Sequence, residues 1–202
     1  MIALAVVGPI ASGKTTVLRL LEELGARTCS ADDLGRELTA TGQPALKRIA
    51  AEFGAGYLQE DGALNRRRLA ELIFRSASAR ERLEGILHPA ILLRIGVWLA
   101  GLRESSDPPV VAAVEVLRLP RRLRAREPFD VVWLCAAPEE TRLRRLIERD
   151  GMPEAEARLR IEIQRGQQVE DCDPDLVLDT KGSPEGLVPR VREAWATLPF
   201  GR

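Results

Sequence analysis

Lysine, histidine and asparagine are scarce in this chain of 202 residues. Only three of its 30 basic residues are lysines, and it contains a single histidine and a single asparagine. The 30 basic and 30 acidic residues balance to a net charge of +0, with a pI of about 6.7. Without a basic excess, the composition argues against a protein whose main role is to wrap duplex nucleic acid.

Cysteine is also scarce, and the usual marks of secretion or of a membrane anchor are missing. The three cysteines lie far apart without metal-ligand spacing, which favours a reduced, cytoplasmic compartment. No basic segment precedes the first apolar residues, so the start of the chain does not resemble a secretory signal. The longest apolar stretch, 86–102, is interrupted by a histidine, a proline and an arginine. It therefore predicts a buried helix and not a membrane span.

The pattern of apolar residues predicts strands alternating with helices. Hydrophobic residues make up 45% of the chain and charged residues 30%, which is typical of a globular protein. Short apolar segments predict strands at 2–7, 27–30, 110–116, 129–136 and 175–179. Amphipathic patterns predict helices at 15–24, 44–53, 65–74, 77–87, 90–102, 138–149, 153–169 and 184–198. This alternation indicates an α/β fold with a parallel sheet covered on both faces.

A phosphate-binding motif follows the first predicted strand. Residues 8–15 read G-P-I-A-S-G-K-T and match G-x-x-x-x-G-K-[ST], between a buried strand and an amphipathic helix. Glycines let the backbone curl with its N–H groups around phosphate oxygens, and the helix dipole adds to the attraction. Lys14 would contact the β- and γ-phosphates, and the Thr15 hydroxyl would ligate Mg²⁺. The alternative is a glycine turn that only links a strand to a helix.

The rest of the sequence limits the kind of P-loop protein. Switch GTPases read the base with Asn-Lys-x-Asp, whereas the single asparagine, Asn65, is not followed by lysine. AAA-type and helicase motors need a longer chain and an acidic pair after a strand, and we find no such pair. A compact enzyme that passes a phosphoryl group to a small molecule remains.

Two neighbouring carboxylates follow the second predicted strand. Asp32 comes at the carboxyl end of this strand, where ligands bind in open parallel sheets. It could accept a proton from an acceptor hydroxyl or hold a Mg²⁺-bound water; the alternative is an N-cap for the next helix. Because Asp33 is as good a cap, we assign the functional role to Asp32 and the capping role to Asp33.

Arginines follow the fourth predicted strand. Arg142, Arg145 and Arg149 are spaced to share one face of the helix at 138–149. Guanidinium groups bind phosphate oxygens in pairs and neutralise the charge that develops during transfer, so this stripe suits a lid over the triphosphate. We expect Arg145 and Arg149 to carry this role. The alternative is a solvated face that pairs with the nearby glutamates.

The single histidine, His88, is predicted to lie at the start of a helix, directly before Pro89. It either stabilises this helix start or contacts the phosphate or ribose of the acceptor. The residues around it leave both roles open.

In their order along the chain, these motifs resemble those of one family, the dephospho-CoA kinases, which phosphorylate the ribose 3′-hydroxyl of dephospho-CoA. The resemblance runs nearly from end to end. It is carried by G-P-I-A-S-G-K-T-T at 8–16, S-A-D-D-L-G-R at 30–36, G-Q-P-A-L at 42–46, D-G-A-L-N-R-R-R-L at 61–69, I-F at 73–74, L-H-P at 87–89 and P-E-E-T-R-L-R-R-L-I-E-R-D-G at 138–151.

This resemblance implies a P-loop fold similar to the nucleoside-monophosphate kinases, with a five-stranded parallel sheet flanked by helices. It implies ATP as the phosphoryl donor, Mg²⁺ as the cofactor, and coenzyme A and ADP as the products. The implied catalytic residues are Lys14, Asp32 and Arg145, and the implied metal ligand is Thr15. Asp32, Arg36 and His88 are implied substrate contacts. The implied nucleotide contacts are Gly8, Ala11, Ser12, Gly13, Lys14, Thr15, Thr16, Arg145 and Arg149.

We expect the whole chain to form one domain, since it is too short for two domains of typical length. The core is expected at about 1–32, 105–137 and 170–202. A helical acceptor-binding region is expected at about 33–104 and a lid at about 138–169. The enzyme is expected to be cytoplasmic and monomeric, and to bind dephospho-CoA but neither nucleic acid nor a membrane.

The chain departs from the family pattern mainly on the acceptor side. Pro9 replaces a glycine, Ser30 replaces the first acid of D-A-D, and Arg142 replaces a glutamine. The segment V-E-V-L-R-L lacks the proline of P-L-L-[FY]-E and has Leu119 in place of its glutamate, for which Glu115 is the candidate replacement. Two alternatives therefore remain. One is a kinase of another small hydroxyl acceptor, such as a nucleoside, nucleotide or sugar; the other is a nucleotide-binding regulator without turnover.

Overall fold

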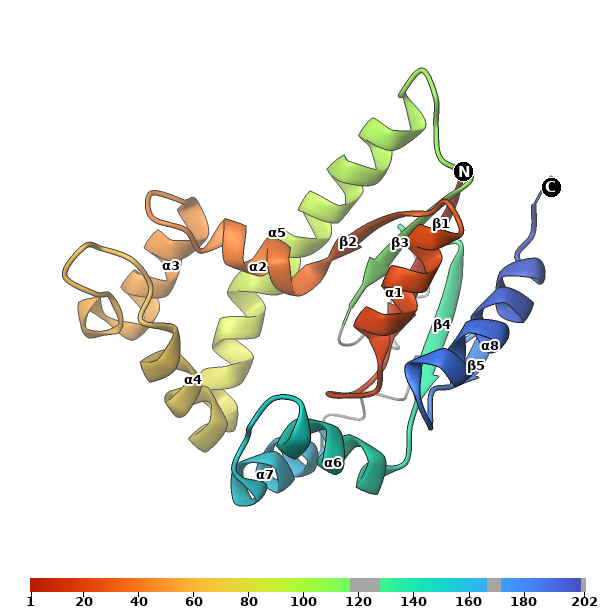
Figure 1. The fold of residues 1–202 in the computed structure, drawn as a ribbon. Helices are drawn as coiled ribbons and strands as arrows, with labels where there is room; N and C mark the ends of the chain where they lie inside the picture. The colour runs from red at the N-terminus through yellow and green to blue at the C-terminus, as the bar shows by residue number, and fades with distance from the viewer. Residues whose placement is uncertain (117–127, 167–171, 201–202) are drawn as a thin grey trace. The chain divides into compact units, whose positions relative to one another are not determined.

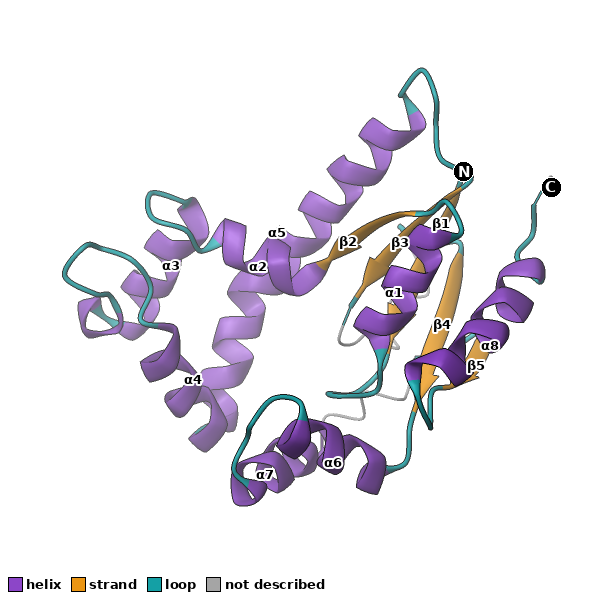
Figure 2. Cartoon of the chain, in the orientation of Figure 1, coloured by secondary structure: helices purple, strands orange, loops and turns teal. Residues whose placement is uncertain are grey.

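The computed structural model describes residues 1–116, 128–166 and 172–200. The chain divides into two compact units (Figure 1). The sheet unit comprises Met1–Ser30 and Leu99–Arg202, and the helical unit comprises Ala31–Trp98. Within the described residues, all five strands belong to the sheet unit (Figure 2).

Five parallel strands form the sheet in the order β2-β3-β1-β4-β5. Because the strands are parallel, their carboxyl ends lie along one edge, where loops can gather residues from distant parts of the chain. The predicted fold class is confirmed, and each predicted strand is present to within two residues at either end. The strands are β1 (Ile2–Val7), β2 (Arg27–Ser30), β3 (Val111–Glu115), β4 (Val131–Ala136) and β5 (Leu176–Asp179).

The core of the sheet unit lies between its central strands and the helices α1 (Lys14–Glu23) and α8 (Pro184–Ala196). Leu4 and Trp133 are almost completely buried, which explains why β1 and β4 read as continuous apolar runs. Burial of such side chains contributes about 1.5–3 kcal/mol each. The packed sheet is therefore a rigid base for the loops at its carboxyl edge.

A smaller apolar cluster joins α6 (Glu139–Glu148) to α7 (Glu154–Gly166). Its buried residues are Leu146, Ala157 and Ile161, and Ile10 and Ala11 of the loop after β1 pack against them. The helix pair and this loop thus share one hydrophobic contact. The last residues of the helix predicted at 153–169, and Leu119, lie outside the described residues.

The helical unit has its own hydrophobic core, which includes Leu46, Ile49, Leu64, Leu69, Leu83 and Ile86. Local sequence explains two of its helix starts. Pro44 is the first residue of α3, where a missing N–H costs nothing, and the Asn65 side chain caps α4 by accepting from the Arg68 N–H at 3.0 Å. The helices are α2 (Ala31–Leu38), α3 (Pro44–Phe53), the 3₁₀ turn η1 (Ala55–Tyr57), α4 (Arg66–Arg75) and α5 (Ala77–Arg103).

The predicted break near Pro89 is wrong, because α5 continues through it from Ala77 to Arg103. Proline has a helical φ, so the helix can tolerate it at the cost of one hydrogen bond, here to the carbonyl of Gly85. His88 consequently lies inside a helix and not at its start. The prediction of a buried helix is also wrong, since only 17% of its most apolar window is buried. Among the described helices, α5 alone has the length and composition to cross a membrane, which by itself is weak evidence.

Candidate active site

The loop between β1 and α1 has the backbone curvature of a phosphate cradle. Gly8, Ala11 and Gly13 all have positive φ, at 148°, 57° and 92°. A Cβ on Gly8 would lie 2.6 Å from the Cys135 carbonyl oxygen, so only glycine fits there. No side chain caps α1, which leaves the N–H groups of its first turn directed toward the loop. These N–H groups and the helix dipole favour an anion.

Ser12 lies fully buried in this loop. Among the described residues, its Oγ has no hydrogen-bond partner, while its main-chain carbonyl accepts from the Thr180 Oγ1 at 2.5 Å. A buried hydroxyl without a partner is unfavourable, and a phosphate oxygen in the loop would relieve it by accepting its proton in a hydrogen bond. The loop therefore fits a phosphate group.

Lys14, Thr15 and Glu115 come together where α1 begins. The Lys14 Nζ donates to the Pro9 carbonyl at 3.1 Å and lies 3.9 Å from Glu115 Oε1. The Thr15 Oγ1 donates to Glu115 Oε2 at 3.1 Å. The side chains of Lys14 and Glu115 are only 10% and 13% exposed, so their charges interact with little screening by water. The ammonium group is thus held beside the phosphate cradle by groups that a phosphate can replace.

The oxygens of Thr15 and Glu115 are the hard ligands that Mg²⁺ prefers. The described ranges contain no cluster of three or more His, Cys, Asp or Glu side chains, so they offer no metal cage made of protein alone. Mg²⁺ in phosphoryl-transfer sites usually takes one or two protein oxygens and completes its shell with phosphates and water. These two residues fit that kind of site.

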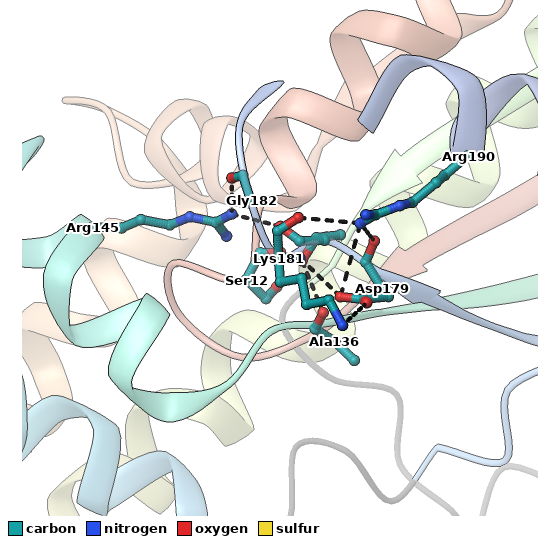
Figure 3. A network of polar contacts seen from close by, with 8 residues as sticks. Ser12, Ala136, Arg145, Asp179, Lys181, Gly182 and Arg190 are labelled. Atoms are coloured by element: carbon teal, nitrogen blue, oxygen red, sulfur yellow. Dashed lines mark hydrogen bonds and ion pairs between the residues drawn. The ribbon is translucent and has the colours of Figure 1, made fainter. Parts of the chain in front are cut away.

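Arg145 links the phosphate-binding loop to the loop after β5, and Figure 3 shows its side chain directed toward Gly182 of the latter loop. Its Nη1 donates to the Ala11 carbonyl at 3.1 Å, and its Nη2 donates to the carbonyls of Thr180 at 2.5 Å and Gly182 at 3.3 Å. Partial burial, together with the charges of Arg149 and a neighbouring arginine, lowers the pKa of Arg145 below its usual value. The guanidinium group stays positive because even a lowered arginine pKa lies far above neutral pH.

The loop after β5 is itself fixed by ion pairs and backbone contacts (Figure 3). The Asp179 carboxylate accepts from the Lys181 N–H at 2.9 Å and pairs with the Lys181 Nζ at 3.1 Å. The Arg190 Nη1 donates to the carbonyls of Asp179 and Lys181 at 2.9 and 3.1 Å. The hydrogen bonds that the Asp179 carboxylate accepts from Lys181, with the charges of Lys181 and Arg190, lower the pKa of Asp179. Arg145 is therefore anchored to a well-ordered turn.

The predicted stripe of three arginines on α6 is divided by the structure. Arg142 is buried with Leu146, whereas Arg149 follows the last helical residue and is exposed. The guanidinium group of Arg149 binds Asp150 through two hydrogen bonds of 2.6 and 3.0 Å. This contact raises the pKa of Arg149 and lowers that of Asp150. Arg145 reaches the phosphate-binding loop through the Ala11 carbonyl, and the charge of Glu115 also acts on Arg149.

Asp32 and Asp33 both lie in the first turn of α2, which begins at Ala31. The prediction that Asp33 caps this helix is wrong, because the helix starts earlier and the Asp33 Oδ1 accepts from the Arg36 Nη1 at 2.9 Å. Ser30, two residues before Asp32, pairs in register with Glu115 at the end of β3. The chain thus passes from the carboxyl edge of the sheet directly into the helix that carries Asp32.

Arg36 lines two cavities of the helical unit, and Asp32 lines the smaller of them. Both residues line a cavity of about 290 Å³ whose remaining walls are largely aliphatic, with Ile49, Ile73 and Ile91 among them. A second cavity of about 540 Å³ is lined by polar and cationic side chains, including Arg36, Arg66 and Arg67. Arg36 and Arg66 line both cavities. His88 lies on the exposed side of α5 and lines neither cavity.

Three residues of the site have little or no local sequence signal. The sequence predicts Glu115 only as a candidate replacement for a missing motif acid, and it predicts no role for Thr180 or Gln164. Gln164 accepts from the Ile10 N–H at 2.6 Å. An acid within an otherwise apolar strand is the one signal that could have pointed to Glu115. Nothing in the sequences around Thr180 and Gln164 sets them apart.

A buried lysine at a P-loop, a threonine paired with a strand-end carboxylate, and this strand order are the features of P-loop kinases. The family model for dephospho-CoA kinase matches residues 2–185, and the chain belongs to the dephospho-CoA kinase family. It is 42% identical over 189 residues to a protein of Geobacter sulfurreducens named dephospho-CoA kinase, a match that covers 94% of each chain.

Solved structures agree with this fold. A crystal structure of a protein from Thermus thermophilus matches with a TM-score of 0.72 and 27% identity, covering 98% of this chain and 97% of the other. The structure of dephospho-CoA kinase from Campylobacter jejuni matches with a TM-score of 0.63 and 22% identity, covering 96% and 95% of the two chains. These matches extend over both the sheet unit and the helical unit.

Proposed function

We propose that this protein transfers the γ-phosphoryl group of ATP to the ribose 3′-hydroxyl of dephospho-CoA, giving coenzyme A and ADP. The observation that carries the proposal is the Lys14–Glu115–Thr15 group at the phosphate-binding loop of a chain from this family. Its three widely spaced cysteines are in keeping with a reducing, cytoplasmic setting.

On the donor side, catalysis would rest on positioning and electrostatic stabilisation. The loop N–H groups and Lys14 would bind the β- and γ-phosphates, and Thr15 with Glu115 would hold Mg²⁺. When bound, Mg²⁺ neutralises charge on these phosphates. Arg145 uses three N–H···O contacts to brace two loops, and a guanidinium group has five N–H donors. Its remaining donors would stabilise the transferred phosphoryl group.

On the acceptor side, Asp32 would orient the attacking hydroxyl and accept its proton. The two cavities of the helical unit would hold the rest of the acceptor. Arg36 and Arg66, which line both cavities, suit a pyrophosphate, and the aliphatic walls of the smaller cavity suit an uncharged chain. His88, exposed on α5, remains a proposed contact to the acceptor.

The proposal is tested by measuring ADP release from ATP and Mg²⁺ with dephospho-CoA, with adenosine, with a sugar, and with no acceptor. We expect release above the no-acceptor rate with dephospho-CoA, and mass spectrometry should detect coenzyme A. Asp32→Asn should lose activity by several orders of magnitude without losing nucleotide binding. Faster release with adenosine or the sugar, or nucleotide binding without release on any acceptor, would refute the assignment.

A further inference from the structure

The middle of the phosphate-binding loop is held from outside by the helix pair α6–α7. The Ile10 N–H donates to the Gln164 Oε1 of α7 at 2.6 Å. The Ala11 carbonyl accepts from the Arg145 Nη1 of α6 at 3.1 Å. Within the loop itself, the Ser12 N–H donates to the Pro9 carbonyl at a longer 3.2 Å. The shortest of these three hydrogen bonds is therefore the one to Gln164.

These outside contacts lie on both sides of a strained residue. Ala11 has a φ of 57°, a left-handed conformation that costs a non-glycine residue roughly 1–2 kcal/mol. Such strain persists only where the surroundings hold it in place. Gln164 binds the peptide group before Ile10, and Arg145 binds the carbonyl of Ala11 itself. The side chains of Ile10 and Ala11 also pack against the apolar cluster of α6 and α7.

We propose that Gln164 is a positioning residue for ATP. By holding the Ile10 N–H, it keeps the loop in the curvature that lets the next N–H groups converge on a phosphate. A side-chain amide suits this task because its oxygen accepts a hydrogen bond without placing a negative charge beside a polyphosphate. The affinity for nucleotide therefore depends on the position of α7, the helix that carries Gln164. The inference rests on the donor half of the proposed function and is independent of the acceptor.

The first test measures binding of the non-hydrolysable analogue β,γ-imido-ATP with Mg²⁺ to the full chain by calorimetry, with no acceptor present. Gln164→Met keeps the length of the side chain but removes the accepting oxygen. We expect its Kd for the analogue to rise about tenfold, which corresponds to the loss of one well-formed hydrogen bond. Glu162→Met, at an exposed position of the same helix, is the matched control and should keep the parent Kd.

The second test follows hydrogen exchange of the Ile10 amide by NMR. Gln164→Met should speed this exchange at least tenfold, whereas Gln164→Glu, which keeps an accepting oxygen, should keep it slow. In steady-state assays, the KM for ATP should rise in Gln164→Met more than the KM for the acceptor. A general loss of structure would instead raise both KM values and lower the unfolding temperature of the variant.

Two results would overturn the inference: a parent Kd for the analogue in Gln164→Met, or equal effects of this change on nucleotide and acceptor. Rapid Ile10 exchange in Gln164→Glu would also count against it. If no variant phosphorylates any acceptor, the proposed function fails, but a weaker Kd in Gln164→Met than in Glu162→Met still supports the positioning role.

Discussion

Glu115 ends β3 with its carboxylate in contact with Thr15 and within 3.9 Å of Lys14. A carboxylate this little exposed remains charged only where cations or donors compensate for lost water. Lys14 and Thr15 supply that compensation, and bound Mg²⁺ would add to it. The charge of Glu115, and not only its shape, therefore belongs to the proposed site.

Glu115→Gln tests that charge, because it keeps the size and the accepting oxygen. We expect kcat to fall about 10²- to 10³-fold, and the Mg²⁺ concentration for half-maximal rate to rise, since one anionic ligand is lost. A Mg²⁺ titration at saturating ATP measures both. Glu23→Gln, at an exposed pair with Arg19, is the control and should behave as the parent. Unchanged Mg²⁺ dependence in Glu115→Gln would exclude a metal role.

Substitutions at two glycines with positive φ distinguish the cost of backbone strain from the cost of close packing. A Cβ on Gly8 would meet the Cys135 carbonyl oxygen at 2.6 Å, whereas a Cβ on Gly25 would have nothing within 4 Å. Both substitutions to alanine carry left-handed strain of about 1–2 kcal/mol. We expect urea unfolding to show a loss of stability of about 1–2 kcal/mol for Gly25→Ala and of at least ~3 kcal/mol for Gly8→Ala. Gly8→Ala should also weaken binding of the ATP analogue. Equal losses would mean that the loop can shift away from Cys135.

The residues of the site differ in how well the sequence predicts them. Lys14 and Thr15 belong to a contiguous motif whose physics is local, so their spacing is enough. The partners Glu115, Gln164 and Thr180 lie 100, 154 and 168 positions from the loop residues that they contact. Those contacts exist only because parallel strands bring distant chain segments to one edge. A single sequence shows where the strands are, but it does not show which of the loops after them come together.

At the scale of elements, strands buried on both faces are predicted well, because they read as unbroken apolar runs between turns. Helix boundaries are predicted less well. A proline usually ends a helix, yet α5 continues through Pro89. Similarly, α2 begins at Ala31, so the acids that suggested a cap lie in its first turn. Acids are favourable at both kinds of position, so their presence does not fix the first residue of the helix.

Pro89→Ala should stabilise the protein, because alanine restores an N–H donor for the Gly85 carbonyl. An interior proline costs a helix about 3 kcal/mol relative to alanine, of which up to ~1 kcal/mol is offset by the greater freedom of the unfolded chain. We therefore expect the free energy of unfolding to rise by about 2–3 kcal/mol in chemical denaturation.

The matched control is Pro44→Ala, because Pro44 begins α3 at a position that needs no N–H. It should be neutral or slightly destabilising. If Pro89→Ala were destabilising as well, the proline ring itself would make stabilising contacts that alanine loses, and the expected gain from the restored hydrogen bond would be refuted.

For the molecule as a whole, the alternation of strands and helices predicts a parallel sheet covered on both faces, but it does not predict the strand order β2-β3-β1-β4-β5. The division into a sheet unit and a helical unit follows from the separate apolar clusters around Leu4 and Ile49. The long helical segment without strand signals predicts a separate helical region, but it does not predict the cavities within that region. The smaller cavity depends on side chains from four separate helices, and no local pattern encodes that combination.

The stability of the molecule should fall in alkali because of Cys135, a fully buried residue of β4. Burial raises the pKa of its thiol from 9.0 to about 12, while the charge of Lys14 opposes the rise and that of Glu115 adds to it. Below pH 9 the thiol is protonated in both the folded and the unfolded chain. Above pH 9 the unfolded chain loses this proton first, so unfolding becomes progressively more favourable until the folded thiol also titrates near pH 12.

At pH 10.5 the Cys135 thiol is expected to lower the free energy of unfolding by about 2 kcal/mol, at about 1.4 kcal/mol per pH unit above the unfolded pKa. This contribution can be isolated by measuring urea unfolding of the parent and of Cys135→Ala between pH 8 and pH 10.5. The variant should be less stable at pH 8, because it loses buried sulfur contacts, but its stability should fall less steeply with pH. Ionisable groups that do not interact with Cys135 are the same in both proteins, so the difference in slope reports the thiol and its coupling to Lys14 and Glu115. Parallel curves would mean that Cys135 exchanges its proton with solvent in the folded chain, and that the sheet edge beneath the phosphate-binding loop opens readily.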